Sequence, residues 1–263
     1  MTSRAKGLLS HPRTRGLSPD DPAVTAARVE IIRQKAFLRK VYELWYGMLA
    51  RAVAGAPGPV LELGSGGGFF QERMPDLISS EVFYLPHVDL VCDARALCFA
   101  EGSLGGIVML DVFHHLPDCG AFLSSAERCL RPGGRIAMIE PWATPFSGLV
   151  YRHLHPEPFE PDAQEWRAPP GGPLSGANQA LPWIVFHRDR QALVQRHPGL
   201  ELLKADPFMP FSYLLSGGVS SRLGLPGFAF SSVRSIERLL APFFPQLAMF
   251  ALIVLRRRAG KTS

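Results

Sequence analysis

Residues 60–70 read VLELGSGGGFF, an apolar run of strand-forming character that ends in an acid and then passes into four glycines within five positions. A buried strand, a tight glycine turn and the start of a helix let backbone N–H groups approach a ligand closely, because no Cβ stands in the way. The stretch therefore predicts a nucleotide-type cradle. The alternative interpretation is a glycine-rich turn that serves only to reverse the chain.

The spacing of the glycines distinguishes between kinds of cradle. A dinucleotide fingerprint that begins at Gly64 needs a small residue at position 69, where Phe69 stands. A Walker loop needs Gly-Lys followed by Ser or Thr, which this stretch lacks. The pattern that fits is acid-x-Gly-x-Gly-x-Gly, which resembles the first motif of class I S-adenosylmethionine-dependent methyltransferases; its members here are Glu62, Gly64, Gly66 and Gly68.

Two later segments extend this resemblance. Residues 110–118, LDVFHHLPD, resemble the segment after the fourth strand in the type 11 methyltransferase subgroup. Residues 130–134, LRPGG, end a predicted helix and lead into an apolar strand, as they do in the same subgroup. The resemblance therefore covers residues 60–141 continuously and in the correct order.

The alternation of strands and helices from residue 60 to about 142 predicts a parallel sheet covered on both faces. The resemblance implies an α/β, Rossmann-like sheet of seven strands whose last strand is antiparallel, with an N-terminal helical lid. We expect a disordered basic tail over 1–20, a helical segment over 21–58, and the methyltransferase domain over 59–263 with an irregular, Pro-rich insertion at 143–183. The predicted strands are 60–63, 78–83, 88–92, 107–110, 135–139, 200–204 and 248–255.

The resemblance assigns S-adenosyl-L-methionine as the cofactor. Glu81 lies 17 positions after Gly64, close to the spacing at which an acid receives hydrogen bonds from a ribose diol. By position, Asp93 and Ala94 inherit contacts with the adenine ring. The predicted cofactor-binding set is Glu62, Gly64, Ser65, Gly66, Gly68, Glu81, Asp93, Ala94 and Asp111.

The histidines are the candidate catalytic residues. His114 and His115 follow the fourth strand, near the expected position of the transferred methyl group, and each predicts either a hydrogen-bonded loop residue or a proton acceptor. Adjacent histidines rarely converge on one ion without further ligands, so no metal site is expected. His155, next to Glu157 in a stretch stiffened by prolines, is the third candidate base.

The insertion is expected to form the pocket of the methyl acceptor. It combines polar groups with aromatic residues, which suits a moderately apolar small molecule or lipid-linked acceptor; the aromatic residues are Trp142, Tyr151, Phe159, Trp166 and Trp183. A second apolar region, 207–215 and 223–230, either lines the same cavity or meets a membrane. The run 241–255 is too short to span a bilayer, and its end is expected to be a buried strand.

Composition limits the remaining possibilities. The chain has 263 residues and a formal net charge of +5, with basic residues gathered at its two ends. Basic ends suit a phospholipid surface or simple solvated tails, and the middle of the chain lacks the basic and aromatic pattern of nucleic-acid binding. Without a signal peptide the expected location is cytoplasmic, with peripheral contact at the inner face of a membrane as a further possibility. The cysteines are expected to be buried thiols; they are Cys92, Cys98, Cys119 and Cys129.

Three functions compete at this level. The leading interpretation is a methyltransferase that acts by in-line methyl transfer. A catalytically inactive protein of the same fold that binds a partner is the alternative, although the intact glycine turn and its acids argue for cofactor binding. An NAD-linked oxidoreductase is disfavoured by Phe69 and by the lack of a Tyr-x-x-x-Lys pair.

Overall fold

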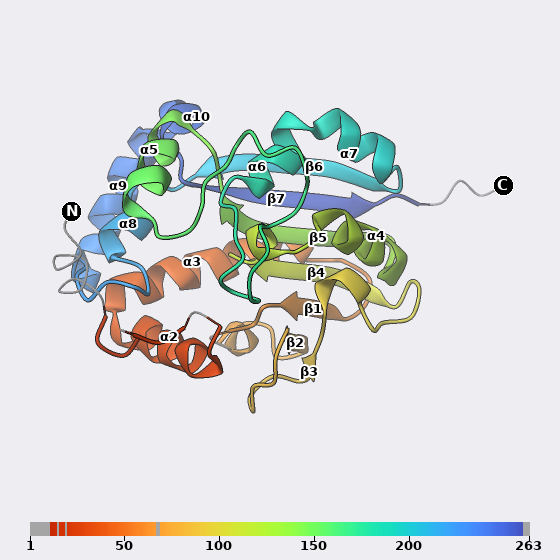
Figure 1. The fold of residues 1–263 in the computed structure, drawn as a ribbon, viewed down its shortest axis with the longest axis horizontal. Coiled ribbons are helices and arrows are strands. Elements are labelled where there is room, and N and C mark those ends of the chain that lie inside the picture. The colour runs from red at the N-terminus through yellow and green to blue at the C-terminus, as the bar shows by residue number, and fades with distance from the viewer. Residues whose placement is uncertain (1–10, 15, 19, 67–68, 260–263) are drawn as a thin grey trace.

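The computed structural model describes residues 11–14, 16–18, 20–66 and 69–259. Its centre is a seven-stranded sheet in the order β3-β2-β1-β4-β5-β7-β6 (Figure 1). The strands are β1 (Val60–Leu63), β2 (Leu77–Glu81), β3 (Leu90–Val91), β4 (Leu104–Leu110), β5 (Leu130–Pro141), β6 (Leu200–Phe208) and β7 (Phe250–Arg257). β1 to β5 pair in parallel, and β7 lies antiparallel between β5 and β6. The predicted fold class and the antiparallel last strand are confirmed.

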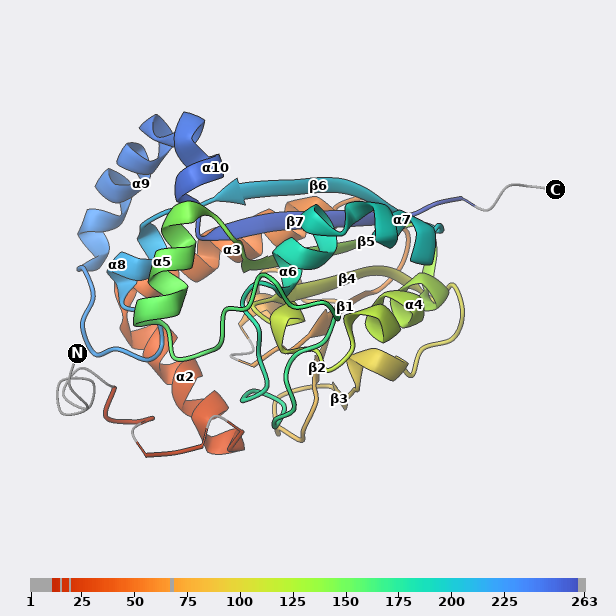
Figure 2. The same cartoon turned by 45° about the horizontal axis from the view of Figure 1, so that its top comes forward.

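Helices cover both faces of this sheet. They are α2 (Pro22–Gln34), α3 (Ala36–Val53), α4 (Cys119–Cys129), α5 (Pro145–Leu154), α6 (Leu181–Trp183), α7 (Arg190–Arg196), α8 (Ser212–Ser216), α9 (Phe230–Leu239) and α10 (Phe244–Leu247). Short turns are η1 (Phe70–Glu72), η2 (Ala94–Ala96), η3 (Phe113–His115), η4 (Ile184–Arg188, of π type), η5 (Gly227–Ala229) and η6 (Ala241–Phe243). Figure 2 shows α5, α8, α9 and α10 gathered at one end of the sheet.

The core divides into two clusters because successive residues of a strand point to opposite faces. On β5, Ile136 and Met138 pack against α4 and the segment from α6 to α7. Ala137 and Ile139 pack on the other face, against α3. All four side chains are fully buried, as expected for a central strand of a doubly covered sheet.

The N-terminal helices lie against the glycine turn, as the predicted lid requires. Asp21 caps α2 by accepting a hydrogen bond from the Ala23 N–H, and Pro22 occupies the first turn. A Cβ placed on Gly66 would lie 3.9 Å from Cγ2 of Thr25, a residue of α2. α2 therefore covers the turn that follows β1 (Figure 1).

The structure corrects four expectations about the chain. Between β1 and β2 the described residues form only the short turn η1, where a helix was expected to start. The insertion at 143–183 is not wholly irregular, because Thr144 and Ser147 form a capping box that starts α5. Cys98 is exposed, whereas the other three cysteines are buried.

The fourth correction concerns the predicted disordered tail over 1–20. Residues 1–10, 15 and 19 lie outside the described part of the chain. The described residues next to them are attached to the domain. The His11 N–H donates to the Ser220 carbonyl at 2.8 Å. Asp20 Oδ1 accepts hydrogen bonds from the N–H groups of Leu174 and Ser175, at 2.7 and 3.0 Å. The segment before α2 is therefore tied to the insertion.

The apolar run 241–255 forms η6, α10 and the beginning of β7, so the buried strand expected at its end is confirmed. Within the described residues, no helix has both the length and the apolar character needed to span a bilayer.

Two glycines with left-handed backbone allow a direct test of packing at the glycine turn: Gly64 and Gly102 have φ of +69° and +60°.

We predict that Gly64→Ala destabilises the protein far more than Gly102→Ala. Both substitutions place a Cβ at positive φ, at a cost of about 1 kcal/mol. At Gly64 the new Cβ would also overlap the Cγ2 methyl of Val112, whereas at Gly102 nothing lies within 4 Å. Chemical unfolding should show about 1–3 kcal/mol of additional loss for Gly64→Ala. Equal losses would mean that Val112 moves aside freely.

Candidate functional site

The glycine turn is fastened to the end of β2 by paired hydrogen bonds. The Ser65 N–H donates to the Ser80 carbonyl at 2.9 Å, and Ser65 Oγ accepts from the Ser80 N–H at 3.0 Å. The Gly66 N–H donates to Oε1 of Glu81 at 3.0 Å. These bonds fix the turn to the end of the neighbouring strand β2. Gly68, the last glycine of the predicted motif, lies outside the described residues.

Gly66 has a left-handed backbone, with φ of +40°, and a Cβ built on it would be in ordinary van der Waals contact with its described neighbours. The nearest of these atoms is the Gly64 carbonyl oxygen at 3.7 Å, followed by Glu81 Oε1 at 3.8 Å. Gly64 is different, because Val112 fills the space beside it. Gly64 therefore serves the close contact between the ends of β1 and β4, and the cradle at Gly66 stays a prediction.

Glu62 carries a buried carboxyl group without a full set of partners. Its residue exposure is 2%, and its Oε2 atom has no hydrogen-bond partner in the part of the chain that the structure describes. Burial raises the pKa of Glu62 to about 8, although a hydrogen bond from Ser65 acts in the opposite direction. An unpartnered carboxyl oxygen beside the glycine turn is suited to a cation or an N–H donor of a ligand.

Glu81 ends β2 and is buried, in agreement with the prediction that an acid stands at the carboxyl end of this strand. Oε1 accepts from Gly66, and Oε2 accepts from the Val82 N–H at 3.0 Å. Burial raises the pKa of Glu81, and these two N–H groups partly offset the effect. Each oxygen keeps lone-pair capacity for a further donor.

Asp93 lies at the start of η2 and pairs with its neighbour Arg95. Its carboxylate accepts from the Arg95 N–H at 2.9 Å and forms an ion pair with the Arg95 guanidinium at 2.7 Å. These contacts lower the pKa of Asp93, led by the side-chain bond from Arg95. Ala94 is buried next to it. The adenine-facing roles of this pair remain predictions.

Asp111 holds a strained backbone position at the end of β4. Its φ is +61°, a left-handed value that Asp tolerates better than most residues. Loss of contact with bulk water raises the pKa of Asp111 to about 6; the His114 charge offsets this, whereas the Glu140 and Glu157 carboxylates add to it. Asp111 in this conformation lies between the glycine turn and the two histidines.

The two adjacent histidines meet two carboxylates that the sequence analysis did not place with them. Glu140, at the end of β5, is fully buried and accepts hydrogen bonds from the N–H groups of Val112 and Phe113, both at 2.8 Å. Nδ1 of His114 lies 2.8 Å from Oε2 of Glu140, and Nε2 of His114 lies 3.5 Å from Oε2 of Glu157. Burial opposes a charge on His114, but these carboxylates raise its pKa well above the usual value.

His115 and His155 also converge on Glu157. Nδ1 of His115 lies 3.0 Å from the Gly176 carbonyl, and its Nε2 lies 3.9 Å from Oε1 of Glu157. Burial, followed by the His114 charge, lowers the pKa of His115 to about 3. His155 Nδ1 accepts from the Glu157 N–H at 3.3 Å, and burial lowers the pKa of His155. This bond favours a loop-anchoring role for His155.

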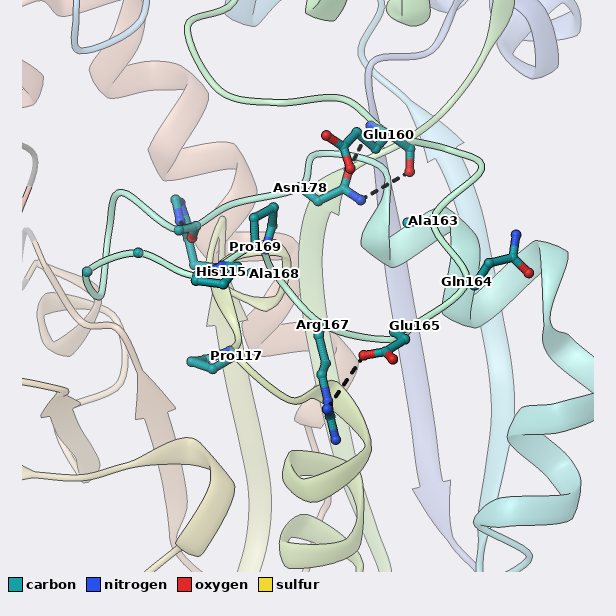
Figure 3. Close-up of a pocket in the computed structure, with 14 residues that line it drawn as sticks. His115, Pro117, Glu160, Ala163, Gln164, Glu165, Arg167, Ala168, Pro169 and Asn178 are labelled. Carbon is teal, nitrogen blue, oxygen red and sulfur yellow. Dashed lines mark hydrogen bonds and ion pairs between the residues drawn. The ribbon is translucent and has the colours of Figure 1, made fainter.

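The insertion forms a cavity of about 590 Å³ beside His115 (Figure 3). The loop walls are joined by Glu160 and Asn178, whose backbone and side-chain groups exchange hydrogen bonds of 2.9 and 3.1 Å. The predicted aromatic walls are wrong: the lining is mainly Pro, Gly, Ala and polar residues. The aromatic side chains are instead used in packing; Trp142, Tyr151 and Trp166 are buried.

Comparison with known proteins identifies the fold. Residues 61–138 match a family model described as a methyltransferase domain. Over these residues the chain is similar to the methyltransferase domain, which agrees with the predicted resemblance to class I S-adenosylmethionine-dependent methyltransferases of the type 11 subgroup. S-adenosyl-L-methionine is the cofactor of such domains. No curated protein matches the sequence.

Solved structures agree with the methyltransferase domain. Geranyl diphosphate C-methyltransferase from Streptomyces coelicolor A3(2), solved with Mg²⁺, geranyl diphosphate and S-adenosyl-L-homocysteine, aligns with a TM-score of 0.51 and 13% identity, over 95% of this chain and 90% of that one. A putative methyltransferase in complex with the Haloferax volcanii Trm112 activator aligns with a TM-score of 0.50 and 15% identity, over 93% of this chain and 100% of that one. At these identities the likeness shows the fold alone.

We predict that Glu62→Gln makes the protein more stable than the wild type as pH rises. The folded-state pKa of Glu62 is raised from 4.5 to about 8, so ionisation favours the unfolded chain between these values and remains unfavourable to folding above them. The stability difference should therefore grow from about pH 4.5 to pH 8, reaching on the order of 3 kcal/mol. Urea unfolding of both proteins at several pH values measures this difference. Glu72→Gln, which alters an exposed acid in the turn η1 that follows β1, is the control.

Proposed function

We propose that this protein transfers the methyl group of S-adenosyl-L-methionine to a small-molecule or lipid-linked acceptor. The observation that supports the proposal best is the buried oxygen of Glu62, which has no hydrogen-bond partner among the described residues and lies beside the glycine turn at the carboxyl edge of the sheet. In open α/β sheets, ligands bind at this edge. The histidine cluster and the cavity of Figure 3 lie on the neighbouring strand ends and loops.

The described residues fit the cofactor in three respects. Gly66 leaves room for close approach, Glu62 offers an acceptor for the methionine ammonium group, and Glu81 retains acceptor capacity for the ribose hydroxyls. When bound, the cofactor supplies a methyl group that its sulfonium charge already activates. The chain therefore needs to bind, orient and exclude water.

We propose that the residues beside the acceptor site position the methyl acceptor and do not remove a proton from it. The lone pair on His155 Nδ1 is used by the Glu157 N–H, so this nitrogen is not a free base. His114 is enclosed by carboxylates, and its raised pKa keeps it protonated in the absence of another cation. We therefore propose that these histidines and Glu157 shape and orient the acceptor site.

The cofactor assignment predicts that Glu81→Gln weakens S-adenosyl-L-homocysteine binding by about 1.5–3 kcal/mol, because one charged acceptor is lost. Gly66→Val should abolish binding, since its side chain would take the space that the proposed cofactor needs beside the turn. Because φ of Gly66 is positive the substitution is also strained, so a melting curve of the variant checks that the domain stays folded. Calorimetric titration with S-adenosyl-L-homocysteine and with NAD measures both effects. Glu101→Gln, at an exposed acid remote from the turn, is the matched control.

The outcomes of this titration separate the competing functions. Binding of NAD in place of S-adenosyl-L-homocysteine would reject the methyltransferase proposal. Undiminished binding by Glu81→Gln would reject the ribose assignment alone. Strong cofactor binding with no methyl transfer in a screen of acceptors would favour the inactive, partner-binding alternative.

We propose further that the protein contacts a membrane through the apolar surface around α9. Six large apolar side chains are exposed there: Leu223, Leu225, Phe228, Ile236, Leu239 and Phe243. Arg222 and Arg238, which are exposed and adjacent in sequence to Leu223 and Leu239, are available to meet lipid phosphates. A surface that joins apolar and basic residues in this way suits the interface of an anionic bilayer and a lipid-linked acceptor.

The membrane proposal predicts co-sedimentation with vesicles of phosphatidylglycerol and phosphatidylcholine. The double substitution Phe228→Ser and Leu239→Ser should reduce the bound fraction at least about tenfold, because two side chains that are 85% and 80% exposed no longer enter the interface. Val194→Ser and Leu203→Ser together are the control, since these exposed residues lie on α7 and β6, away from the group of helices that contains α9 (Figure 2). Equal binding by wild type and the α9 variant would overturn the proposal.

A further inference from the structure

We infer that His114, His115 and Glu157 form a binding site for one divalent transition-metal ion. One potential ligand atom from each residue lies within 4.8 Å of the other two. The residues come from η3 and from the loop after α5, so the fold brings together ligands that are about 40 positions apart. The third ligand, whose absence argued against a metal in the sequence, is Glu157.

The hydrogen bond of His115 determines which of its nitrogens is free. Nδ1 lies 3.0 Å from the carbonyl oxygen of Gly176, which can only accept, so Nδ1 carries the proton. The neutral ring then has a lone pair on Nε2, and that atom lies 3.9 Å from Oε1 of Glu157. A lone pair and a carboxylate repel each other unless a cation lies between them.

His114 is arranged in the same way. Its Nδ1 lies 2.8 Å from Oε2 of Glu140, whose carboxylate also receives backbone N–H groups and is therefore the acceptor. Nε2 of His114 is fully buried and has no hydrogen-bond partner, yet it lies 3.5 Å from Oε2 of Glu157. Metal-binding histidines characteristically donate their second N–H to a carboxylate or a backbone carbonyl, and both partners are found here.

The carboxylate of Glu157 is also held in place. The side-chain amide of Gln179 donates to its Oε2 atom, which restricts the direction of the group. A proton on His114 would satisfy the contact with Glu157 but would leave the lone pair of His115 facing the carboxylate. One metal ion satisfies all three groups.

Distances and ligand types indicate the class of ion. In a tetrahedral site with bonds of about 2.0–2.1 Å, neighbouring ligand atoms are about 3.3 Å apart. The separations of 3.5 and 3.9 Å need only small side-chain movements to reach this value. Two imidazoles and one carboxylate suit Zn²⁺, Fe²⁺ or Co²⁺, whereas Mg²⁺ and Ca²⁺ prefer sites built from oxygen.

A second group, Asp111, His114 and Glu140, is also compact but does not form the site. Its shortest link is the hydrogen bond from His114 Nδ1, and Glu140 is occupied by backbone donors. Three protein ligands at the proposed site leave positions for other ligands. Because His115 also lines the cavity of Figure 3, an oxygen of the methyl acceptor is the expected additional ligand; this last point rests on the proposed function, whereas the metal site does not.

The test is to measure metal binding by the full chain without an affinity tag, after treatment with a chelator. Equilibrium dialysis with Zn²⁺, and separately with Co²⁺, should give one ion per chain by elemental analysis. The Co²⁺ protein should show visible absorption bands of a low-coordinate site, and Zn²⁺ should raise the melting temperature. Absence of bound metal after dialysis against both ions would overturn the inference.

Variants locate the ion. His115→Gln and Glu157→Gln should each weaken Zn²⁺ binding by at least about 100-fold, since loss of a direct ligand exceeds the usual effect of an outer partner. His153→Gln, an exposed histidine of α5, should bind as the wild type does. His114→Gln is a poorer test because this fully buried residue also supports the fold. Wild-type affinity in both His115→Gln and Glu157→Gln would place any bound metal elsewhere.

Titration with S-adenosyl-L-homocysteine keeps the two proposals distinct. His115→Gln and Glu157→Gln should bind this ligand as the wild type does, because the hydrogen bonds that His115 and Glu157 form within the described residues go to the insertion, at Gly176 and Gln179. Metal binding without S-adenosyl-L-homocysteine binding would contradict the proposed function and leave the metal site intact. The reverse result would reject the metal site alone.

Discussion

The buried carboxylate of Glu140 is the interaction on which the rest of the site depends. Standing at the end of β5, it receives the N–H groups of Val112 and Phe113 and the ring of His114. A charge buried without such donors would be strongly destabilising, so the loop after β4 is held where it satisfies this group. The turn η3 and both of its histidines are positioned as a consequence.

The same loop connects the cofactor side with the acceptor side. Val112 lies against Gly64, so the glycine turn and the histidine cluster share one packed contact. Asp111, with its left-handed backbone, is the residue between them. Val112 and Asp111 are therefore the residues through which the glycine turn and the histidine cluster are held in fixed positions relative to each other.

The elements outside the sheet complete the enclosure of the candidate site. α2 covers the glycine turn through Thr25, and Asp20 binds the backbone of the insertion at Leu174 and Ser175. The N-terminal segment therefore bridges the two loops that border the site. The prolines and glycines of the insertion build the cavity wall, while its aromatic residues are used to anchor it; Tyr151, for example, donates to the Met249 carbonyl beside β7.

The sequence by itself determined the sheet, because apolar runs separated by turns at regular intervals can be buried only in a covered parallel arrangement. It also located the acids of the cofactor side, since Glu62 and Glu81 end or nearly end such runs. Glu140 likewise follows an apolar run, at the end of the fifth strand, and this position alone marks it as an acid at the same edge of the sheet. The grouping of His114 with Glu140 and Glu157 was decided only by the tertiary structure, because these residues lie on three separate segments and no local spacing relates them. The core positions of the insertion's aromatic residues have the same origin, because burial against distant elements overrides the local pattern.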